Sequence, residues 1–280
     1  MTHAATTAPL AVILAAGRGS RLAGAAGDCP KCLLRVGGRT LLERQVATLG
    51  ACGVGAITVV VGYQAIRVAH VCGTAARTVE NPRYAETNSL YSLWLARDQL
   101  AAGFVVLNGD VLFHPQLLRD LLSSRVEDAL VVEFRDPRLE PFGGEEMKVR
   151  VRGGRVEDIA KTLDGGEADA ENVGLAKFGP DGARLLVEEM DALVAAGRLR
   201  EWAPRAFQAF ARRRPLHAVG TRGFPWIEID FPEDYARATR EVLPLIDAPG
   251  TGAVAALDPV VPALAPDAAE AEWRPQPGHV

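Results

Sequence analysis

The feature that most constrains the fold is a short apolar run leading directly into a turn of small residues. Residues 10–14 read LAVIL, and the residues expected to approach a ligand are Leu14, Ala15, Ala16, Gly17 and Gly19. An apolar run of this length, bounded by small residues, indicates a buried strand. Small residues let the backbone come close to a ligand beyond the strand's carboxyl end, where open α/β sheets bind their ligands. The sequence therefore predicts an α/β fold with a ligand site at this turn.

Basic residues after the turn indicate that the ligand carries phosphate groups. Arg21 can bind phosphate as a planar fork and Lys31 as a point charge. The spacing fits neither a P-loop nor a dinucleotide fingerprint, because the latter's third glycine is replaced by Leu22. The alternative is an ordinary strand-to-helix connection with incidental basic residues. We expect a nucleoside triphosphate site in which Arg21 and Lys31 are catalytic cations.

The composition is that of a globular protein with a small-molecule ligand. The chain has 280 residues, of which 48% are hydrophobic and 24% charged, enough to bury a full core. A net charge of −4 argues against a surface that binds nucleic acid. No apolar run reaches the roughly 18 residues that span a bilayer, and the first residues lack a leader pattern. We therefore expect a cytoplasmic protein with no nucleic-acid or membrane partner; the oligomeric state has no sequence signal.

The chain has four cysteines, too few for a disulfide scaffold at this length. Cys29-Pro-Lys-Cys32 has the spacing of a redox motif or half of a zinc site. No second pair with this spacing supplies partner ligands, and the motif lies within the predicted phosphate-binding loop. We therefore interpret it as part of that loop.

Strand-like and helix-like segments alternate, which is typical of βαβ units and of a mixed, mostly parallel sheet flanked by helices. A β-hairpin is expected at residues 146–161 around Gly153-Gly154, as a lid or as the floor of an acceptor pocket. Residues 9–246 are expected to form one domain, and the Ala- and Pro-rich residues 247–280 a flexible tail. Strands are predicted at 10–14, 56–62, 77–80, 104–107, 129–134, 172–178 and 226–229, and helices at 40–52, 64–72, 89–100, 181–196, 203–212 and 232–242.

Two aspartates follow predicted strands, in the segments LNGD and WIEID. Asp110 and Asp230 could therefore meet at the ligand-binding edge of the sheet and hold Mg²⁺, which prefers carboxylate oxygens together with substrate phosphates. Asp110 could instead be a turn residue after Gly109, and Asp230 a helix cap. Glu228 lies two residues before Asp230, so on a strand it would point the same way and either join the metal site or face solvent.

Several segments occur in the order found in a known family. LAAGRGSRL (residues 14–22) and PKCLLRVGGRTLLER (30–44) resemble the signature of the sugar nucleotidyltransferase superfamily. Later segments resemble its branch of phosphocholine, phosphonate and polyol-phosphate cytidylyltransferases: NPRYAETNSLYSLWLA (81–96), VLNGDVLF (106–113), EMKVRVRGGRVEDIAKTL (146–163), AENVGLAKF (170–178) and PWIEIDFPEDYARA (225–238). The resemblance covers about residues 11–245. The sequence departs from the pattern at residues 23–29, where AGAAGDC replaces the more usual proline and threonine residues.

The resemblance implies a Rossmann-like nucleotide-diphospho-sugar transferase fold and Mg²⁺-dependent transfer of a nucleotidyl group. It implies that Ala15, Ala16 and Gly17 approach the base and ribose, and that Arg21 and Lys31 hold the triphosphate. Asp110 and Asp230 would ligate Mg²⁺, and the catalytic Lys161 would face the acceptor's phosphoryl group. Within these segments we also assign Asn81, Asn88 and Asp110 to the nucleotide, and Asn88, Tyr91, Lys161, Asn172 and Glu228 to the acceptor.

The acceptor pocket is less constrained by the sequence. Asn88 could contact substrate or cap the helix that follows it. An aromatic cage for choline could draw on Tyr84, Tyr91, Trp94, Trp202 and Trp226. Helical spacing favours core packing for Trp94, and packing also suits Trp202. Lys148, Arg150 and Arg152 share one face of a hairpin strand, which is either a polyanion site or, as we favour, a solvated face.

The predicted chemistry needs no strong base, because a phosphate or phosphonate acceptor is already anionic near neutral pH. The site has to bring two anions together and stabilise charge on the leaving pyrophosphate. None of the five histidines lies in a catalytic pattern. We therefore predict transfer of CMP from CTP to a small phosphate or phosphonate acceptor. The alternatives are a uridylyl-, guanylyl- or molybdopterin-type nucleotidyltransferase on the same fold, and a non-catalytic nucleotide-binding regulatory protein.

Overall fold

The computed structural model describes residues 10–22 and 28–248, which contain one large mixed sheet. Its strand order is β5-β4-β1-β6-β11-β8-β12-β10-β9. Two short strand pairs, β2 with β3 and β7 with β13, lie outside it. The bounds are β1 (Leu10–Ala15), β2 (Arg35–Val36), β3 (Arg39–Thr40), β4 (Ala56–Val61), β5 (Arg77–Glu80), β6 (Phe104–Asn108), β7 (Val111–Phe113), β8 (Ala129–Phe134), β9 (Lys148–Arg152), β10 (Arg155–Ala160), β11 (Ala170–Phe178), β12 (His217–Gly220) and β13 (Trp226–Glu228).

The N-terminal half of the sheet is parallel, as the alternating sequence pattern predicts. In β5, β4, β1 and β6 all neighbours pair in parallel, and Leu14 of β1 lies opposite Asn108 of β6. β1, β4 and β6 are apolar runs that are almost entirely buried, as expected for strands covered on both faces. Because parallel strands end at the same edge, the turns that follow β1 and β6 lie side by side.

The C-terminal half of the sheet is largely antiparallel and closes on itself. β11 pairs antiparallel with β6, β8 and β9, and β12 joins β8 to the β9–β10 hairpin. The strands β11, β8, β12, β10 and β9 therefore form a closed cycle of pairings. The predicted hairpin is confirmed, but it is a continuous part of the main sheet. Parallel pairing is thus largely confined to the first half of a mixed sheet.

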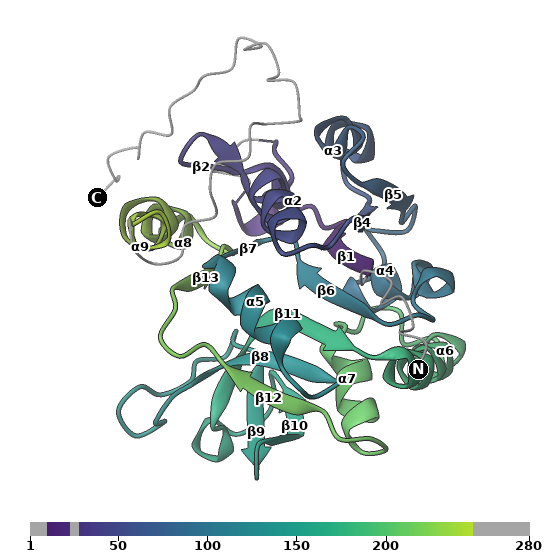
Figure 1. Ribbon diagram of the computed structural model, residues 1–280, viewed down its shortest axis with the longest axis vertical. Helices are drawn as coiled ribbons and strands as arrows, with labels where there is room; N and C mark the ends of the chain where they lie inside the picture. The colour runs from purple at the N-terminus through teal and green to yellow at the C-terminus, as the bar shows by residue number, and fades with distance from the viewer. Residues whose placement is uncertain (1–9, 23–27, 249–280) are drawn as a thin grey trace, which may run out of the picture.

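Helices cover both faces of the sheet (Figure 1). On one face α2 (Leu41–Ala51), α3 (Ala65–Cys72) and α5 (Pro115–Ser123) contribute to a core that includes Ile13 and Val105. On the other face α4 (Ser89–Leu95), α6 (Pro180–Ala195) and α7 (Pro204–Ala211) contribute to a second core. The alternation of strands and helices in the sequence accounts for this layered arrangement.

Local signals explain several helix ends. Thr40 and Glu43 form a capping box at the start of α2, which matches the predicted helix start. Pro115, Pro180 and Pro204 occupy first turns, where the missing N–H has no cost. The predicted helix at 89–100 is shorter: α4 ends at Leu95 and a separate 3₁₀ turn follows.

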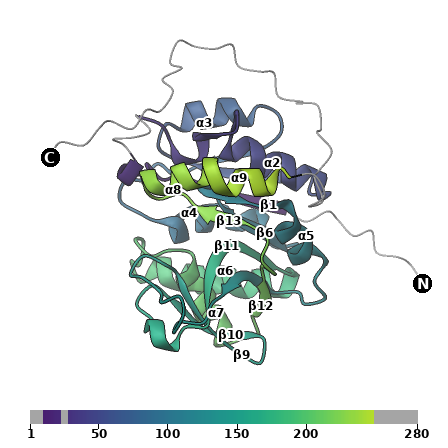
Figure 2. The ribbon, with the colours of Figure 1, turned by 90° about the vertical axis from the view of Figure 1, so that its left-hand side faces the viewer.

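The C-terminal helices pack on a third, smaller core beside the sheet (Figure 2). They comprise α8 (Pro232–Arg237), a π-helical turn (Ala238–Val242) and α9 (Leu243–Ile246). The predicted strand at 226–229 forms as β13, but it pairs with β7 outside the main sheet. The predicted tail beyond residue 248 and the departure from the family pattern at residues 23–27 lie outside the described residues. Among the described residues, no helix combines the length and apolar character needed to cross a bilayer.

Candidate active site

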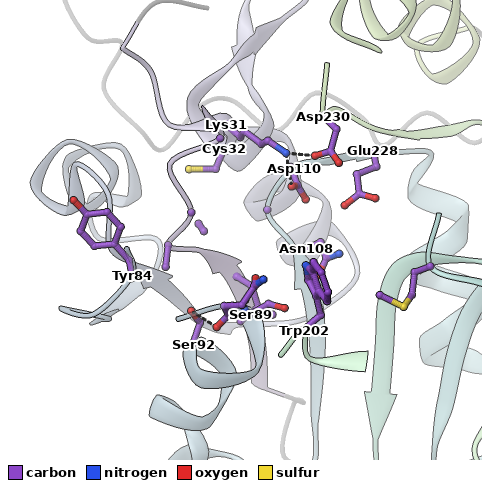
Figure 3. A pocket seen from close by; sticks show the side chains of 18 of the residues that line it. Lys31, Cys32, Tyr84, Ser89, Ser92, Asn108, Asp110, Trp202, Glu228 and Asp230 are labelled. Carbon is purple, nitrogen blue, oxygen red and sulfur yellow. Dashed lines mark hydrogen bonds and ion pairs between the residues drawn. The ribbon is translucent and has the colours of Figure 1, made fainter. Parts of the chain in front are cut away.

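A cavity of about 360 Å³ lies at the carboxyl ends of β1 and β6, where the two halves of the sheet meet (Figure 3). Its lining includes the predicted site residues Leu14, Ala15, Ala16, Gly17, Gly19, Arg21, Lys31, Asn81, Asn88, Asp110, Lys161, Asn172, Glu228 and Asp230. These residues come from segments spread over most of the chain. The structure therefore brings the predicted nucleotide, acceptor and metal residues into one cavity.

The turns after β1 and β6 approach each other closely, which explains their small residues. A Cβ added at Gly109 would lie 2.8 Å from the carbonyl oxygen of Leu14, too close for any side chain. Gly19 has a φ of +68°, and a Cβ there would collide with the side chain of Lys31. Gly109 thus lets the two turns pack closely, and Gly19 leaves room for the side chain of Lys31 to pass over the turn.

Three carboxylates meet beside these turns: Asp110, Glu228 and Asp230. Each can offer an oxygen atom, and the three oxygens lie within 4.8 Å of one another. The small β7–β13 sheet causes this meeting, since Glu228 pairs with Val111 and the N–H of Ile229 donates to the carbonyl of Asp110 at 3.0 Å. We call Asp110, Glu228 and Asp230 the cavity cluster.

The structure resolves the alternatives for these acids. The N-cap of α8 is Phe231, and the N–H groups of Asp230 and Phe231 both donate to the carboxylate of Asp234. The carboxylate of Asp230 is therefore directed at the cavity and does not cap the helix. Asp110 lies in the turn after Gly109 and also lines the cavity, so its place in a turn is compatible with a position that faces a ligand. Glu228 joins the cluster instead of facing solvent.

Lys31 supplies positive charge to the cavity cluster. Its Nζ donates to Asp110 at 3.3 Å and also to Asp230 (Figure 3). Burial alone would lower the pKa of Lys31, but the carboxylates of Asp110 and Asp230 raise it above its ordinary value. Burial, together with the negative charges of Asp110 and Asp230, raises the pKa of Glu228 to about 8. The cluster therefore holds more negative charge than Lys31 balances, and it is suited to a further cation.

Two more cations line the cavity near the cluster, and both contact Glu145. Arg21 donates to Asp230 at 3.3 Å and to Glu145 at 2.9 Å. Lys161, directly after β10, donates to the same oxygen of Glu145 at 3.3 Å and lies 5.0 Å from the ring centre of Trp202. Arg21, Lys31 and Lys161 thus surround the space in front of the carboxylates, which is suited to bind several phosphate groups.

Amide side chains line the rest of the cavity. Asn81 is buried, and its amide donates to Thr87 at 3.0 Å and to Ser92 at 3.1 Å. Asn88 accepts from the N–H of Ser89 at 2.8 Å, so it caps α4 while also lining the cavity. Asn172 is buried and accepts from the N–H of Gly174 at 3.0 Å. These amides are held in place by the chain and present polar groups to a ligand.

The structure does not bring Tyr91 to the cavity with the other predicted acceptor residues. Of the predicted site residues, all of which lie in the described ranges, Tyr91 is absent from the cavity lining. Ser89 and Ser92 of α4 face the cavity, and helical geometry turns Tyr91 to a neighbouring face. There its ring stacks on Trp94 at 5.3 Å.

The basic strand of the hairpin is solvated only at Arg152, and none of its three basic residues lines the cavity. Lys148 is buried and donates to the carbonyl of Gly143 at 2.8 Å. Arg150 pairs with Glu157 and Glu167, and Arg152 with Asp169. The two arginines thus pair with acidic side chains of neighbouring segments. The alternation of residues along the strand does not reveal these partners.

Both residues of the CxxC motif have free thiols. Burial raises the pKa of the Cys32 thiol far above its ordinary value, which disfavours the reactive thiolate. Cys32 lines the cavity beside Lys31, in agreement with the interpretation of this segment as part of the phosphate-binding loop.

Glu145 and Trp202 are among the cavity residues that sequence reasoning does not assign to the site. Glu145 has no local motif, because its contacts to Arg21 and Lys161 depend on distant segments. Trp202 was considered for a cage but judged suited to packing; the structure leaves it 43% exposed and in the cavity lining. Trp202 lies just before α7 and outside the apolar spacing of that helix. This position was the available signal that Trp202 does not pack in the core.

Comparison with known proteins identifies the family. The family model of the MobA-like NTP transferase domain matches residues 11–169. A bifunctional IPC transferase and DIPP synthase from Rubrobacter xylanophilus is 35% identical over 239 residues, covering 83% of this chain and 52% of the relative. A choline-phosphate cytidylyltransferase from Streptococcus pneumoniae is 35% identical over 115 residues, covering 41% of this chain and 50% of the relative. The chain thus spans about half the length of these curated relatives.

A solved structure agrees with this result. The CTP:phosphocholine cytidylyltransferase from Streptococcus pneumoniae superposes with a TM-score of 0.70 at 25% identity, covering 82% of this chain and 97% of the other. This similarity confirms the predicted Rossmann-like nucleotidyltransferase fold. Since the family model also matches more than half of the sequence, the chain belongs to the MobA-like NTP transferase domain family.

Proposed function

We propose that the protein is a cytidylyltransferase that transfers CMP from CTP to a small phosphate or phosphonate acceptor and releases pyrophosphate. One observation carries the proposal: in a single cavity, three carboxylates face Arg21, Lys31 and Lys161 beside a glycine-rich turn. The names of the relatives above support both the CTP donor and the phosphorylated acceptor.

The cavity offers separate places for the two substrates. The backbone of Ala15, Ala16 and Gly17 approaches the base and ribose of CTP, while Arg21 and Lys31 bind its phosphates. Lys161 binds the phosphoryl group of the acceptor from the opposite side. Holding two anions in line converts a bimolecular encounter into a step within one complex, which is where much of the rate enhancement arises.

The residues of the cavity cluster fit a resident Mg²⁺. Asp110, Glu228 and Asp230 provide the hard oxygen donors that this ion prefers, and they already attract the ammonium group of Lys31. When bound, Mg²⁺ would neutralise charge on the triphosphate and on the departing pyrophosphate. Lys31 would then no longer be needed to balance Asp110 and Asp230 and would be available to bind the phosphates.

The reaction requires no general base. An oxygen of the anionic acceptor attacks the α-phosphorus of CTP, a new phosphorus–oxygen bond forms, and the bond from the α-phosphorus to the bridging oxygen breaks. Pyrophosphate takes up the electron pair and leaves. Arg21 and Lys31 stabilise the charge that grows on it, and this stabilisation is worth more in a cavity than in bulk water.

A pyrophosphate-release assay tests the proposal. The purified protein is given each of the four ribonucleoside triphosphates together with phosphocholine, 2-aminoethylphosphonate or inositol 1-phosphate, with and without Mg²⁺. We expect release with CTP, dependence on both Mg²⁺ and an acceptor, and loss of release in Asp110→Ala. Preference for UTP or GTP would replace the cytidylyl assignment, and CTP binding without turnover on a wide acceptor panel would favour a regulatory protein.

A further inference from the structure

Glu145 lies at the mouth of the cavity and contacts a cation from each substrate side. One oxygen, Oε2, accepts from Arg21 Nη1 at 2.9 Å and from Lys161 Nζ at 3.3 Å. Arg21 follows the glycine-rich turn and Lys161 follows β10, so the two cations come from opposite halves of the sheet. Glu145 therefore bridges the nucleotide side and the acceptor side of the cavity.

The bridge is electrostatic and open to solvent. The hydrogen bonds and charges of Lys161 and Arg21 lower the pKa of Glu145, so it is ionised at neutral pH. Its side chain is 57% exposed, and neither cation is fully buried. Ion pairs of this kind contribute little to stability, so phosphate groups can displace the carboxylate readily.

The chain around Glu145 is anchored close on both sides. The carbonyl of Gly143 accepts from Lys148 at 2.8 Å, and the carbonyl of Met147 accepts from the N–H of Asn172 at 2.9 Å. Between these anchors, Gly144 has open space around its α-carbon. Glu145 can thus move away from the cations while the ends of its segment stay in place.

We propose that Glu145 is a positioning residue that couples the binding of the two substrates. In the ligand-free protein its carboxylate holds Arg21 and Lys161 together, and its charge repels an incoming phosphate from either position. The first substrate to bind displaces Glu145 and thereby also frees the other cation. Because the displacement has to be made only once, each substrate binds more tightly when the other is present. This inference rests on the proposed placement of the two substrates.

Glu145→Gln tests the coupling, because glutamine keeps the size of the side chain and removes its charge. The matched control is Glu140→Gln, which removes a carboxylate from the same loop; the ion pair of Glu140 is with Arg135, at 3.9 Å. In initial-rate experiments with both substrates varied, we expect the wild type and the control to show positive coupling of about two- to fivefold. In Glu145→Gln we expect the coupling factor to fall to about one and kcat to change little. The KM for each substrate, extrapolated to zero concentration of the other substrate, should fall by about the same two- to fivefold.

A second measurement does not depend on turnover. Calorimetric titration with pyrophosphate, in the presence and absence of inorganic phosphate, reports anion binding at the two cations directly. We expect Glu145→Gln to bind pyrophosphate about two- to fivefold more tightly than the wild type and the control. If no acceptor is turned over but this difference is found, the inference about Glu145 stands and the proposed reaction fails. Identical titrations for Glu145→Gln and Glu140→Gln, or negative coupling in the wild type, would overturn the inference.

Discussion

Two groups of carboxylates gathered around basic residues differ mainly in what they face. The cavity cluster is paired with Lys31 and Arg21 and lines the cavity. The second group, which we call the inner cluster, consists of Glu133, Glu140, Glu146 and Glu171 near Arg135. Burial raises the pKa of one glutamate in each: Glu228 to about 8 and Glu171 to about 7. A shifted pKa alone therefore does not distinguish the functional cluster.

Access to a ligand distinguishes them. In the inner cluster Glu133 accepts hydrogen bonds from Thr221 and from Trp226 Nε1, and Arg135 pairs with Glu171. No member of this cluster belongs to the described cavity lining. Trp226 and Glu228 are two residues apart on β13, so one strand serves both clusters. The comparison teaches that the same residue types can lie enclosed within the fold or open to a cavity, and that only the open group is placed to meet a ligand.

The largest expected difference between the clusters is in turnover. Under the proposed function Asp230→Asn removes a carboxylate that would hold Mg²⁺, and we expect kcat in the pyrophosphate-release assay to fall by about 100-fold or more. The matched variant Glu133→Gln retains an acceptor for Thr221 and Trp226, and its kcat is expected to stay close to that of the wild type. Comparable losses in the two variants, with both folded by circular dichroism, would show that the distinction between the clusters is wrong.

The pH dependence of stability provides the next test. The folded-state pKa of Glu171, about 7, lies above its ordinary value of 4.5, so between these values the folded protein binds more protons than the unfolded chain. The free energy of unfolding is therefore expected to fall as pH rises from about 4.5 to about 7, by at most about 3 kcal/mol from this group. Urea unfolding across this range would show the slope, and Glu171→Gln should reduce it, leaving the part that comes from Glu228, whose pKa is also raised. An unchanged slope in the variant would contradict the assignment.

Removing the basic residue of each cluster should separate stability from activity. The side chain of Glu171 is only 9% exposed, against 24% and 22% for Asp110 and Asp230, and Arg135→Ala leaves Glu171 without its partner. We expect a loss of about 2 kcal/mol in the free energy of unfolding, with turnover largely retained. For Lys31→Ala we expect the opposite. Turnover should fall strongly because the phosphates lose a cation, and the free energy of unfolding should change less because the cavity admits water to the carboxylates. Urea unfolding and pyrophosphate release on both variants check this; a larger stability loss in Lys31→Ala would break the comparison.

Much of the cavity was predictable because its signals are local. The glycine-rich turn, Arg21, Lys31 and the position of Asp110 after a strand can all be recognised within short segments. Asp230 and Glu228 were also found, although their strand pairs with β7 outside the main sheet. Parallel strands and their helices follow from the alternating pattern, so most strands and helices of the N-terminal half were expected, although their order in the sheet was not.

The remaining features depend on contacts between distant residues. Glu145 meets Arg21 and Lys161 only because the loop before β9 passes over the cavity mouth. The inner cluster forms because Glu133 and Glu171 are opposite one another in the β8–β11 pairing. Strand order and register are long-range properties, and neither propensity nor spacing encodes them directly. The position of Tyr91 outside the cavity lining has another origin, since it depends on which face of α4 turns towards the sheet.

The smallest expected effect concerns the tryptophan beside each cluster. Trp202 lines the cavity beneath Lys161, so Trp202→Ala should raise the KM for the acceptor by about fivefold, the effect of one aromatic contact with a cation or an apolar group. The KM for CTP and the free energy of unfolding should change little. Trp226→Phe removes the hydrogen bond to Glu133 and should lower the free energy of unfolding by about 1 kcal/mol without changing either KM. Steady-state kinetics and urea unfolding on both variants provide the test. A change in the KM for CTP as large as that for the acceptor in Trp202→Ala would place Trp202 at the nucleotide instead.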